Sequence, residues 1–386
     1  MTEEMLKKLD FNYTLKLLKN MISINSIVGN EGELGEFLRN ELEALGLKCL
    51  LVEVERGRPN VYSKLIGKNI GYKLNFNGHT DTIPVVDGWE TDPFNPVIKN
   101  GKLFGLGVCD MKTGIACALN MLRAFVESEH SFNGELSFSG VVDEEGFGKG
   151  AKAMLASEHG KVDAIVLGEP YSGDELKPIP LGITGKILYE IIVKGKAAHA
   201  FRPHLGINAI EELGKILVNL NKLHFRDHVK FGRGNFSTLK IEGGYEIYSV
   251  TVPAFARMEV NRLLVPGETV ESAINDMETL IHSLNLSAEV TVNIKPPRYE
   301  AYIDDQNHTI FQVFENVYRK VMGKAPLYEY TTGITDANIF AGEGHIPCLH
   351  LGPHQEVAHQ KNEYVPLDCL EPLSTMYSLI AANFLK

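Results

Sequence analysis

Helix and strand patterns alternate along the first 182 residues, and this alternation constrains the possible folds more than any other feature of the sequence. Residues 31–46 (EGELGEFLRNELEALG) have the spacing of an amphipathic helix that ends at Gly46. Residues 49–55 and 72–78 have the apolar patterns of strands. Such alternation predicts an α/β fold in which a mainly parallel sheet lies between layers of helices.

The pattern changes near residue 183. From there to residue 294 the segments follow the order strand, helix, strand, strand, helix, strand, which is that of a ferredoxin-like α+β unit. The α/β character then returns, with helices expected over 309–323 and 370–386. We therefore expect one discontinuous α/β domain, residues 1–182 and 295–386, that carries an inserted domain, residues 183–294.

Composition excludes several classes of function. A length of 386 residues favours two domains, and a net charge of -11 argues against binding to nucleic acids or to anionic membrane surfaces. The N-terminus lacks the apolar core of a signal peptide, and no apolar run reaches the roughly 18 residues needed to cross a bilayer. The five cysteines form no C-x-x-C pair, which argues against a disulfide framework and favours the cytoplasm.

Histidines and acids gather at the predicted strand ends. In open α/β sheets, ligand sites lie beyond the carboxyl ends of the strands, so residues that follow different strands can meet in one crevice. Five separate segments supply such residues. They are His79 and Asp81, Asp110, Glu144 and Glu145, Glu169, and His359.

These residue types are typical ligands of a divalent cation such as zinc. Two such ions can lie about 3.5–4 Å apart when one carboxylate bridges them. A bridging Asp110 would divide the ligands evenly, with His79 and Glu169 on one ion and Glu145 and His359 on the other.

Two acids remain after this division. Glu144 would act as the general base, and Asp81 would accept a hydrogen bond from the second ring nitrogen of His79. Each residue alone also has an ordinary structural interpretation. Asp110 could cap the following helix, and Glu144 could belong to an acidic turn. The shared position at strand ends favours the metal site.

Eight segments extend this pattern over nearly the whole chain. They are NGHTDTIP, LFGLGVCDMKTG, DEEGFGKG, LGEP, GKAAHAFRPHLGINAI, VPGET, TTGITDA and LGPHQEVAHQKNEYV. As an ordered set, they resemble the M20 metallopeptidases and amidohydrolases, a family that includes acetylornithine deacetylase, succinyl-diaminopimelate desuccinylase, aminoacylase, carboxypeptidase G and peptidase T.

The resemblance implies the same ligand assignment and the same roles for Glu144 and Asp81, with zinc as the metal and cobalt or manganese as alternatives. It also implies a cis peptide after Asp110, and an inserted domain that acts as a lid and joins two chains in a homodimer. His199 matches a lid histidine that reaches the partner subunit's active site and holds the substrate's carbonyl oxygen. Arg262 lies where the family often has an arginine for the substrate carboxylate. On their own, these last two residues could be a surface histidine and a salt-bridge partner.

The function expected from this resemblance is two-zinc hydrolysis of an amide bond in a small N-acyl-amino acid. The alternatives are a di- or tripeptidase or a carboxypeptidase of the same family, and a non-catalytic relative that binds only metal or ligand. Residues 170–186 (PYSGDELKPIPLGITGK) lack the Arg-rich, Gly-Ser segment of strict desuccinylases, so the sequence does not identify the acyl group of the substrate. The absence of a G-x-S-x-G elbow argues against serine chemistry.

Overall fold

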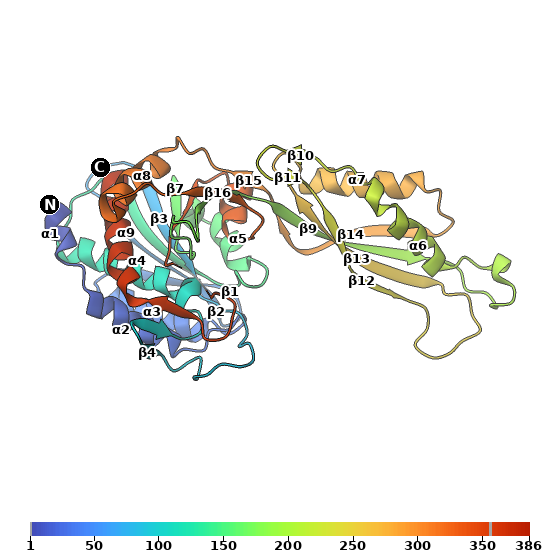
Figure 1. Ribbon diagram of the computed structural model, residues 1–386, viewed down its shortest axis with the longest axis horizontal. Coiled ribbons are helices and arrows are strands. Elements are labelled where there is room, and N and C mark those ends of the chain that lie inside the picture. The colour runs from blue at the N-terminus through green and yellow to red at the C-terminus, as the bar shows by residue number, and fades with distance from the viewer. Residues whose placement is uncertain (1, 355–356) are drawn as a thin grey trace. The chain divides into compact units, whose positions relative to one another are not determined.

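The computed structural model describes residues 2–354 and 357–386, so Gln355 and Glu356 of the last resembling segment lie outside it. The chain divides into two compact units (Figure 1). Unit 1 comprises Met1–Gly182, Asp304–Glu329 and Thr335–Lys386, and unit 2 comprises Ile183–Ile303 and Tyr330–Ile334. The domain boundary expected at residue 295 falls inside a strand, β14 (Glu289–Tyr299), because that strand continues beyond the apolar pattern that indicated it.

Unit 1 is built on a six-stranded mixed sheet in the order β1-β2-β6-β3-β7-β17. Its strands are β1 (Cys49–Glu55), β2 (Arg58–Ile66), β3 (Lys73–His79), β6 (Glu135–Val141), β7 (Ala164–Leu167) and β17 (Cys348–His350). The strands from β6 to β17 are parallel, whereas β1 and β2 pair antiparallel. The antiparallel edge arises because a turn at Arg56 and Gly57 folds β2 back onto β1, and Gly57 (φ 76°) suits such a turn.

Helices cover both faces of this sheet (Figure 1). Phe76 of β3 packs on Tyr377 of α9 (Leu370–Phe384) with ring centroids 5.0 Å apart. The next residue, Asn77, points to the opposite face, where its amide lies 3.7 Å from the Met154 sulfur of α5 (Lys149–Leu155). The other helices of unit 1 are α1 (Thr2–Leu6), α2 (Phe11–Ile22), α3 (Gly32–Ala44), α4 (Thr113–Glu127) and α8 (Thr309–Met322).

Short strands complete unit 1. A three-stranded antiparallel sheet contains β4 (Val97–Lys99), β5 (Lys102–Phe104) and β18 (Tyr364–Pro366). The chain passes between the units within or beside β8 (Ile179–Ile183), β15 (Tyr302–Ile303) and β16 (Tyr328–Thr331). No helix within the described ranges combines the length and the apolar character that crossing a bilayer requires.

Unit 2 contains a four-stranded antiparallel sheet in the order β12-β13-β9-β14. Along the chain its elements are β9 (Gly185–Lys194), α6 (Ala209–Asn219), the hairpin β10 (Asp227–His228) and β11 (Gly232–Arg233), β12 (Phe236–Gly243), β13 (Phe255–Leu264), α7 (Val270–Ser283) and β14. Alternate residues of β9, from Ile187 to Val193, are buried under α6 and α7. This alternation is the period of a strand with one buried face.

Candidate metal centre

The parallel strands of unit 1 bring the predicted ligands to one edge of the sheet. His79 is the last residue of β3, Glu145 follows the end of β6, and Glu169 follows the end of β7. Because β6, β3 and β7 are neighbouring parallel strands, their carboxyl ends lie side by side. The sequence argument from strand ends therefore places these three residues together.

Asp110 lies between two imidazole rings. Its Oδ1 is 3.0 Å from Nε2 of His79, and its Oδ2 is 3.2 Å from Nε2 of His359. Asp110 belongs to the turn Val108–Lys112 before α4, and the cis peptide implied by the family resemblance is present between Asp110 and Met111. One carboxylate thus faces two histidines from distant parts of the chain.

Glu145 and Glu169 each lie beside one of these two histidines. Oε1 of Glu145 lies 2.9 Å from Nε2 of His359, and Oε1 of Glu169 lies 3.9 Å from Nε2 of His79. Potential ligand atoms of His79, Asp110 and Glu145 lie within 4.8 Å of one another, as do those of His79, Glu144 and Glu169. The structure therefore gathers all five predicted ligands and Glu144.

The contacts of Asp81 differ from the expected hydrogen bond between its carboxylate and the His79 ring. Nδ1 of His79 lies 2.9 Å from the backbone oxygen of Asp81 and 3.8 Å from its Oδ1. The Asp81 carboxylate instead accepts hydrogen bonds from the backbone N–H groups of Glu144 (3.2 Å) and Glu145 (2.9 Å). Asp81 thus contacts the His79 ring through its carbonyl and the acidic turn through its side chain.

These contacts fit a bound cation. A carbonyl oxygen only accepts, so Nδ1 of His79 carries a hydrogen, and Nε2 faces an Asp110 oxygen at 3.0 Å. With a neutral ring, Nε2 and this oxygen are both acceptors, and a cation bound between them would satisfy both. Oε1 of Glu169 is buried and has no hydrogen-bond partner within the described part of the chain. Imidazole nitrogen and carboxylate oxygen are donors that zinc, cobalt and manganese accept.

The charges around Glu144 lead to the same conclusion. Burial, followed by the charge of Glu169, raises the pKa of Glu144 well above its usual range. Burial and the charge of Asp110 raise the pKa of Glu169 in the same way. Asp336, only 2% exposed, adds another acid whose charge acts on both glutamates. Compensating cations would allow these carboxyl groups to ionise together.

The two remaining predicted residues lie in unit 2. His199 is exposed, and its Nδ1 accepts a hydrogen bond from the N–H of Phe201 (3.2 Å). Arg262, expected to bind a substrate carboxylate, is fully buried and donates to Glu268 (2.8 Å) and Asp276 (2.9 Å). Its position on β13 points into the core, so its guanidinium is occupied by these acids and is withheld from a ligand.

Several residues near the centre escaped the sequence analysis. Asp143 has a positive φ (72°) directly before the two glutamates, and Arg58 donates to its carboxylate at 2.7 Å. Glu363 accepts hydrogen bonds from the turn that carries Asp110. Arg58 and Glu363 do not follow a central strand, so strand-end reasoning passes over them. Asp143 does follow β6, but its contact with Arg58 depends on a distant segment of the chain.

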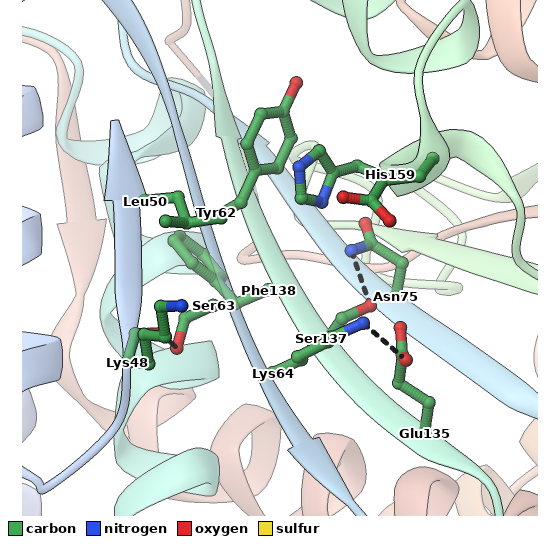
Figure 2. A pocket seen from close by; sticks show the side chains of 11 residues that line it. Lys48, Leu50, Tyr62, Ser63, Lys64, Asn75, Glu135, Ser137, Phe138 and His159 are labelled. Carbon is green, nitrogen blue, oxygen red and sulfur yellow. Dashed lines mark hydrogen bonds and ion pairs between the residues drawn. The ribbon is translucent and has the colours of Figure 1, made fainter. Parts of the chain in front are cut away.

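Unit 1 also contains a cavity of about 240 Å³ away from this centre (Figure 2). Tyr62 and His159 stack there with ring centroids 3.8 Å apart, and Lys64 pairs with Glu135 at 3.0 Å. Its lining includes none of the predicted metal ligands. This cavity is therefore not part of the metal centre.

Comparison with known proteins agrees with this geometry. The model of peptidase family M20/M25/M40 matches residues 75–383. Succinyl-diaminopimelate desuccinylase from Legionella pneumophila (strain Lens) is 29% identical over 384 residues, which cover 96% of this chain and 98% of the relative. The desuccinylase from Orientia tsutsugamushi (strain Boryong) is 28% identical, with 94% of each chain covered.

Solved structures share the fold. Aminopeptidase PepT from Bacillus cereus has a TM-score of 0.79 at 20% identity, covering 98% of this chain and 100% of that one. A dinuclear metal-binding peptidase of the M20 family from Bacillus subtilis has a TM-score of 0.73 at 16% identity, covering 97% and 98%. With the family model spanning most of its length, this chain belongs to peptidase family M20/M25/M40 and is a metal-dependent hydrolase of amide or peptide bonds.

Proposed function

We propose that this protein removes the acyl group from small N-acyl-amino acids by hydrolysing their amide bond. The observation that carries the proposal is the placement of the Asp110 carboxylate, with one oxygen toward His79 and the other toward His359. Similarity to the desuccinylases over nearly the full length favours an acyl-amino acid as the substrate class.

The proposed centre holds two divalent cations. Zinc is the expected metal, with cobalt or manganese as alternatives. His79 and Glu169 would hold one ion, Glu145 and His359 the other, and Asp110 would bridge them. When bound, such ions polarise the amide carbonyl and lower the pKa of water. The ligand set offers one imidazole and two carboxylates to each ion, which suits this role.

Glu144 is the proposed general acid and base. It lies among the ligands, and the backbone of its turn is held by hydrogen bonds from the N–H groups of residues 144 and 145 to the Asp81 carboxylate. It would take a proton from the water that attacks the amide carbon and return it to the amide nitrogen as that nitrogen leaves. The same group can serve both steps because the carboxylate that accepts the proton becomes the acid that returns it.

Unit 2 is the proposed lid and dimerisation domain, with a ferredoxin-like arrangement and His199 reaching the centre of a partner subunit. Exposed apolar side chains support an association through this unit. They are Phe201 (84% exposed), Ile247 (83%) and Tyr248 (91%). A cytoplasmic location is proposed from the five cysteines, all of which are free thiols.

A peptidase of the same family is the second candidate. Residues 170–186 lack the arginine-rich segment of strict desuccinylases, and this absence favours a substrate without a succinyl carboxylate. Di- and tripeptides, or a peptide C-terminus, would fit the same centre.

One experiment separates these candidates. The protein is reconstituted with Zn²⁺, Co²⁺ or Mn²⁺ and assayed on N-succinyl- and N-acetyl-amino acids and on a dipeptide panel. Faster hydrolysis of acyl-amino acids supports the proposal, and faster hydrolysis of dipeptides supports the peptidase. Bound metal without hydrolysis of any substrate would support a non-catalytic relative.

A further inference from the structure

Glu363 links two segments that meet at the metal centre. It lies between His359 and strand β18, and its side chain is buried with 2% of the residue exposed. Its backbone oxygen accepts a hydrogen bond from the N–H of Gly105 (3.1 Å), and Tyr364 then pairs with Phe104 of β5. The segment that carries His359 is thereby joined to the strand that leads into the Asp110 turn.

The Glu363 carboxylate receives three backbone N–H groups from this turn. Oε2 accepts from Gly107 at 2.8 Å, and Oε1 accepts from Cys109 at 2.7 Å and from Asp110 at 3.1 Å. Gly107 has a φ of 72°, and a Cβ there would lie 2.4 Å from the Thr82 methyl group, so the turn needs glycine at this position. Converging N–H groups form a concave site that favours a negative charge.

The turn is anchored from its other side as well. Lys112 is 1% exposed, and its Nζ donates to the backbone oxygens of Met21 (2.9 Å) and Ile24 (3.3 Å). The backbone between Gly107 and Lys112 is therefore held at both ends. Asp110 lies between these anchors, so the direction of its carboxylate depends on them.

We propose that Glu363 is a positioning residue for both cations, because it fixes the backbone of the one ligand that the two ions share. This inference rests on the proposed function. Glu363 acts through Asp110 and has no direct contact with the proposed substrate. Its loss would allow the Asp110 carboxylate to turn away from His79 and His359, so that both ions would lose a ligand at once.

A purely structural role would give a different result. If Glu363 only satisfied buried N–H groups, its replacement would lower the stability of the fold and leave the metal affinity of the folded protein unchanged. A positioning role changes the affinity itself. Loss of a residue that orients a metal ligand typically weakens metal binding by about 10- to 100-fold.

The test compares Glu363→Gln, Glu363→Asp and a control, Glu371→Gln, in metal-free protein titrated with Zn²⁺ by calorimetry. Glu371 is exposed in the first turn of α9, outside the described contacts of the centre. In Glu363→Gln, an amide N–H faces the N–H of Gly107, so the turn must shift. We expect both Zn²⁺ affinities to fall by about 10-fold or more, kcat to fall with KM little changed, and the control to match wild type.

Glu363→Asp keeps the charge with a shorter reach, so we expect an intermediate affinity; it also supplies the test if Glu363→Gln does not fold. Wild-type affinity for both ions in a folded Glu363 variant, checked by circular dichroism, would overturn the inference while leaving the proposed function intact. Wild-type protein that binds neither ion would instead overturn the proposed function, and this inference with it.

Discussion

The guanidinium of Arg58 lies 2.7 Å from the carboxylate of Asp143, directly before the two glutamates of the centre. A second buried acid, Glu31, accepts two hydrogen bonds from the same guanidinium, at 2.6 and 2.7 Å. The Asp143 backbone oxygen accepts N–H groups from residues 146, 147 and 148, so the acidic turn winds around this residue. Arg58 therefore stabilises the turn that presents Glu144.

Replacing Arg58 by methionine should leave Glu31 and Asp143 buried without their cation. The cost of breaking such a pair is about 3 kcal/mol of the free energy of unfolding. Urea denaturation measures this loss. Arg319→Met is the matched control, because its contact with Glu315 is exposed and at 4.0 Å, so the expected change is below about 1 kcal/mol. Equal effects in both variants would contradict the role assigned to Arg58.

Glu144→Gln should keep both metal ions and lose turnover. The amide keeps the shape of the side chain but cannot carry the proton, and general base catalysis contributes at least about 100-fold to a rate. Metal content by elemental analysis and kcat by a stopped assay measure the two effects. A variant that keeps a near wild-type rate would show that another group moves the proton.

Asp81→Ala should weaken metal binding and slow turnover together. The substitution removes the acceptor of the backbone N–H groups of Glu144 and Glu145, while the backbone oxygen that faces His79 remains. We expect Zn²⁺ affinity to fall by about 10-fold or more, as for other residues that orient ligands. Unchanged affinity would mean that the acidic turn holds its position without Asp81.

Arg262→Met should lower stability and leave KM unchanged, because Arg262 pairs with Glu268 and Asp276 inside unit 2. The expected loss is about 3 kcal/mol in the free energy of unfolding. Arg257→Met, on the same strand with a half-exposed side chain, is the control, with a loss of about 1 kcal/mol or less. A large rise in KM for Arg262→Met alone would restore the substrate role that the sequence suggested.

Stability should depend on pH through Asp304. Burial raises the pKa of this carboxyl group to about 7, although it accepts a hydrogen bond from the N–H of Cys348 (3.2 Å). In the unfolded chain it ionises near its ordinary pKa of about 4, so the folded chain holds more protons between these values. The contribution of Asp304 to stability therefore falls as the pH rises from about 4 to 7.

The variant Asp304→Asn removes this ionisation and keeps an oxygen for the Cys348 N–H. We expect its melting temperature, relative to wild type, to be higher at pH 8 than at pH 5. Thermal denaturation at both pH values measures the difference. The same difference at both would show that Asp304 ionises freely in the folded chain.

Much of the centre follows from the sequence because parallel strands place their carboxyl ends together. His79, Glu145 and Glu169 each lie at or just beyond the end of one of three neighbouring strands, so local patterns were enough to bring them together. The same argument named Asp110 and His359, although the turn before α4 and the loop after β17 have no regular period, and the family resemblance implies the same two ligands.

Other features depend on contacts between distant residues and so left no local pattern. Glu363 reaches the Asp110 turn through the pairing of two short strands, β5 and β18. The His79 ring contacts a carbonyl rather than the Asp81 carboxylate, because that carboxylate is taken by two backbone N–H groups. The position of Arg262 in the sequence suggested a ligand, whereas its alternation on β13 places it in the core.

Anomalous diffraction at the zinc edge, from crystals of the Zn²⁺-reconstituted protein, tests the central claim most directly. The account predicts two peaks about 3.5–4 Å apart, one beside His79 and Glu169, the other beside Glu145 and His359, with Asp110 in contact with both. A single peak, or peaks that lie away from Asp110, would contradict it.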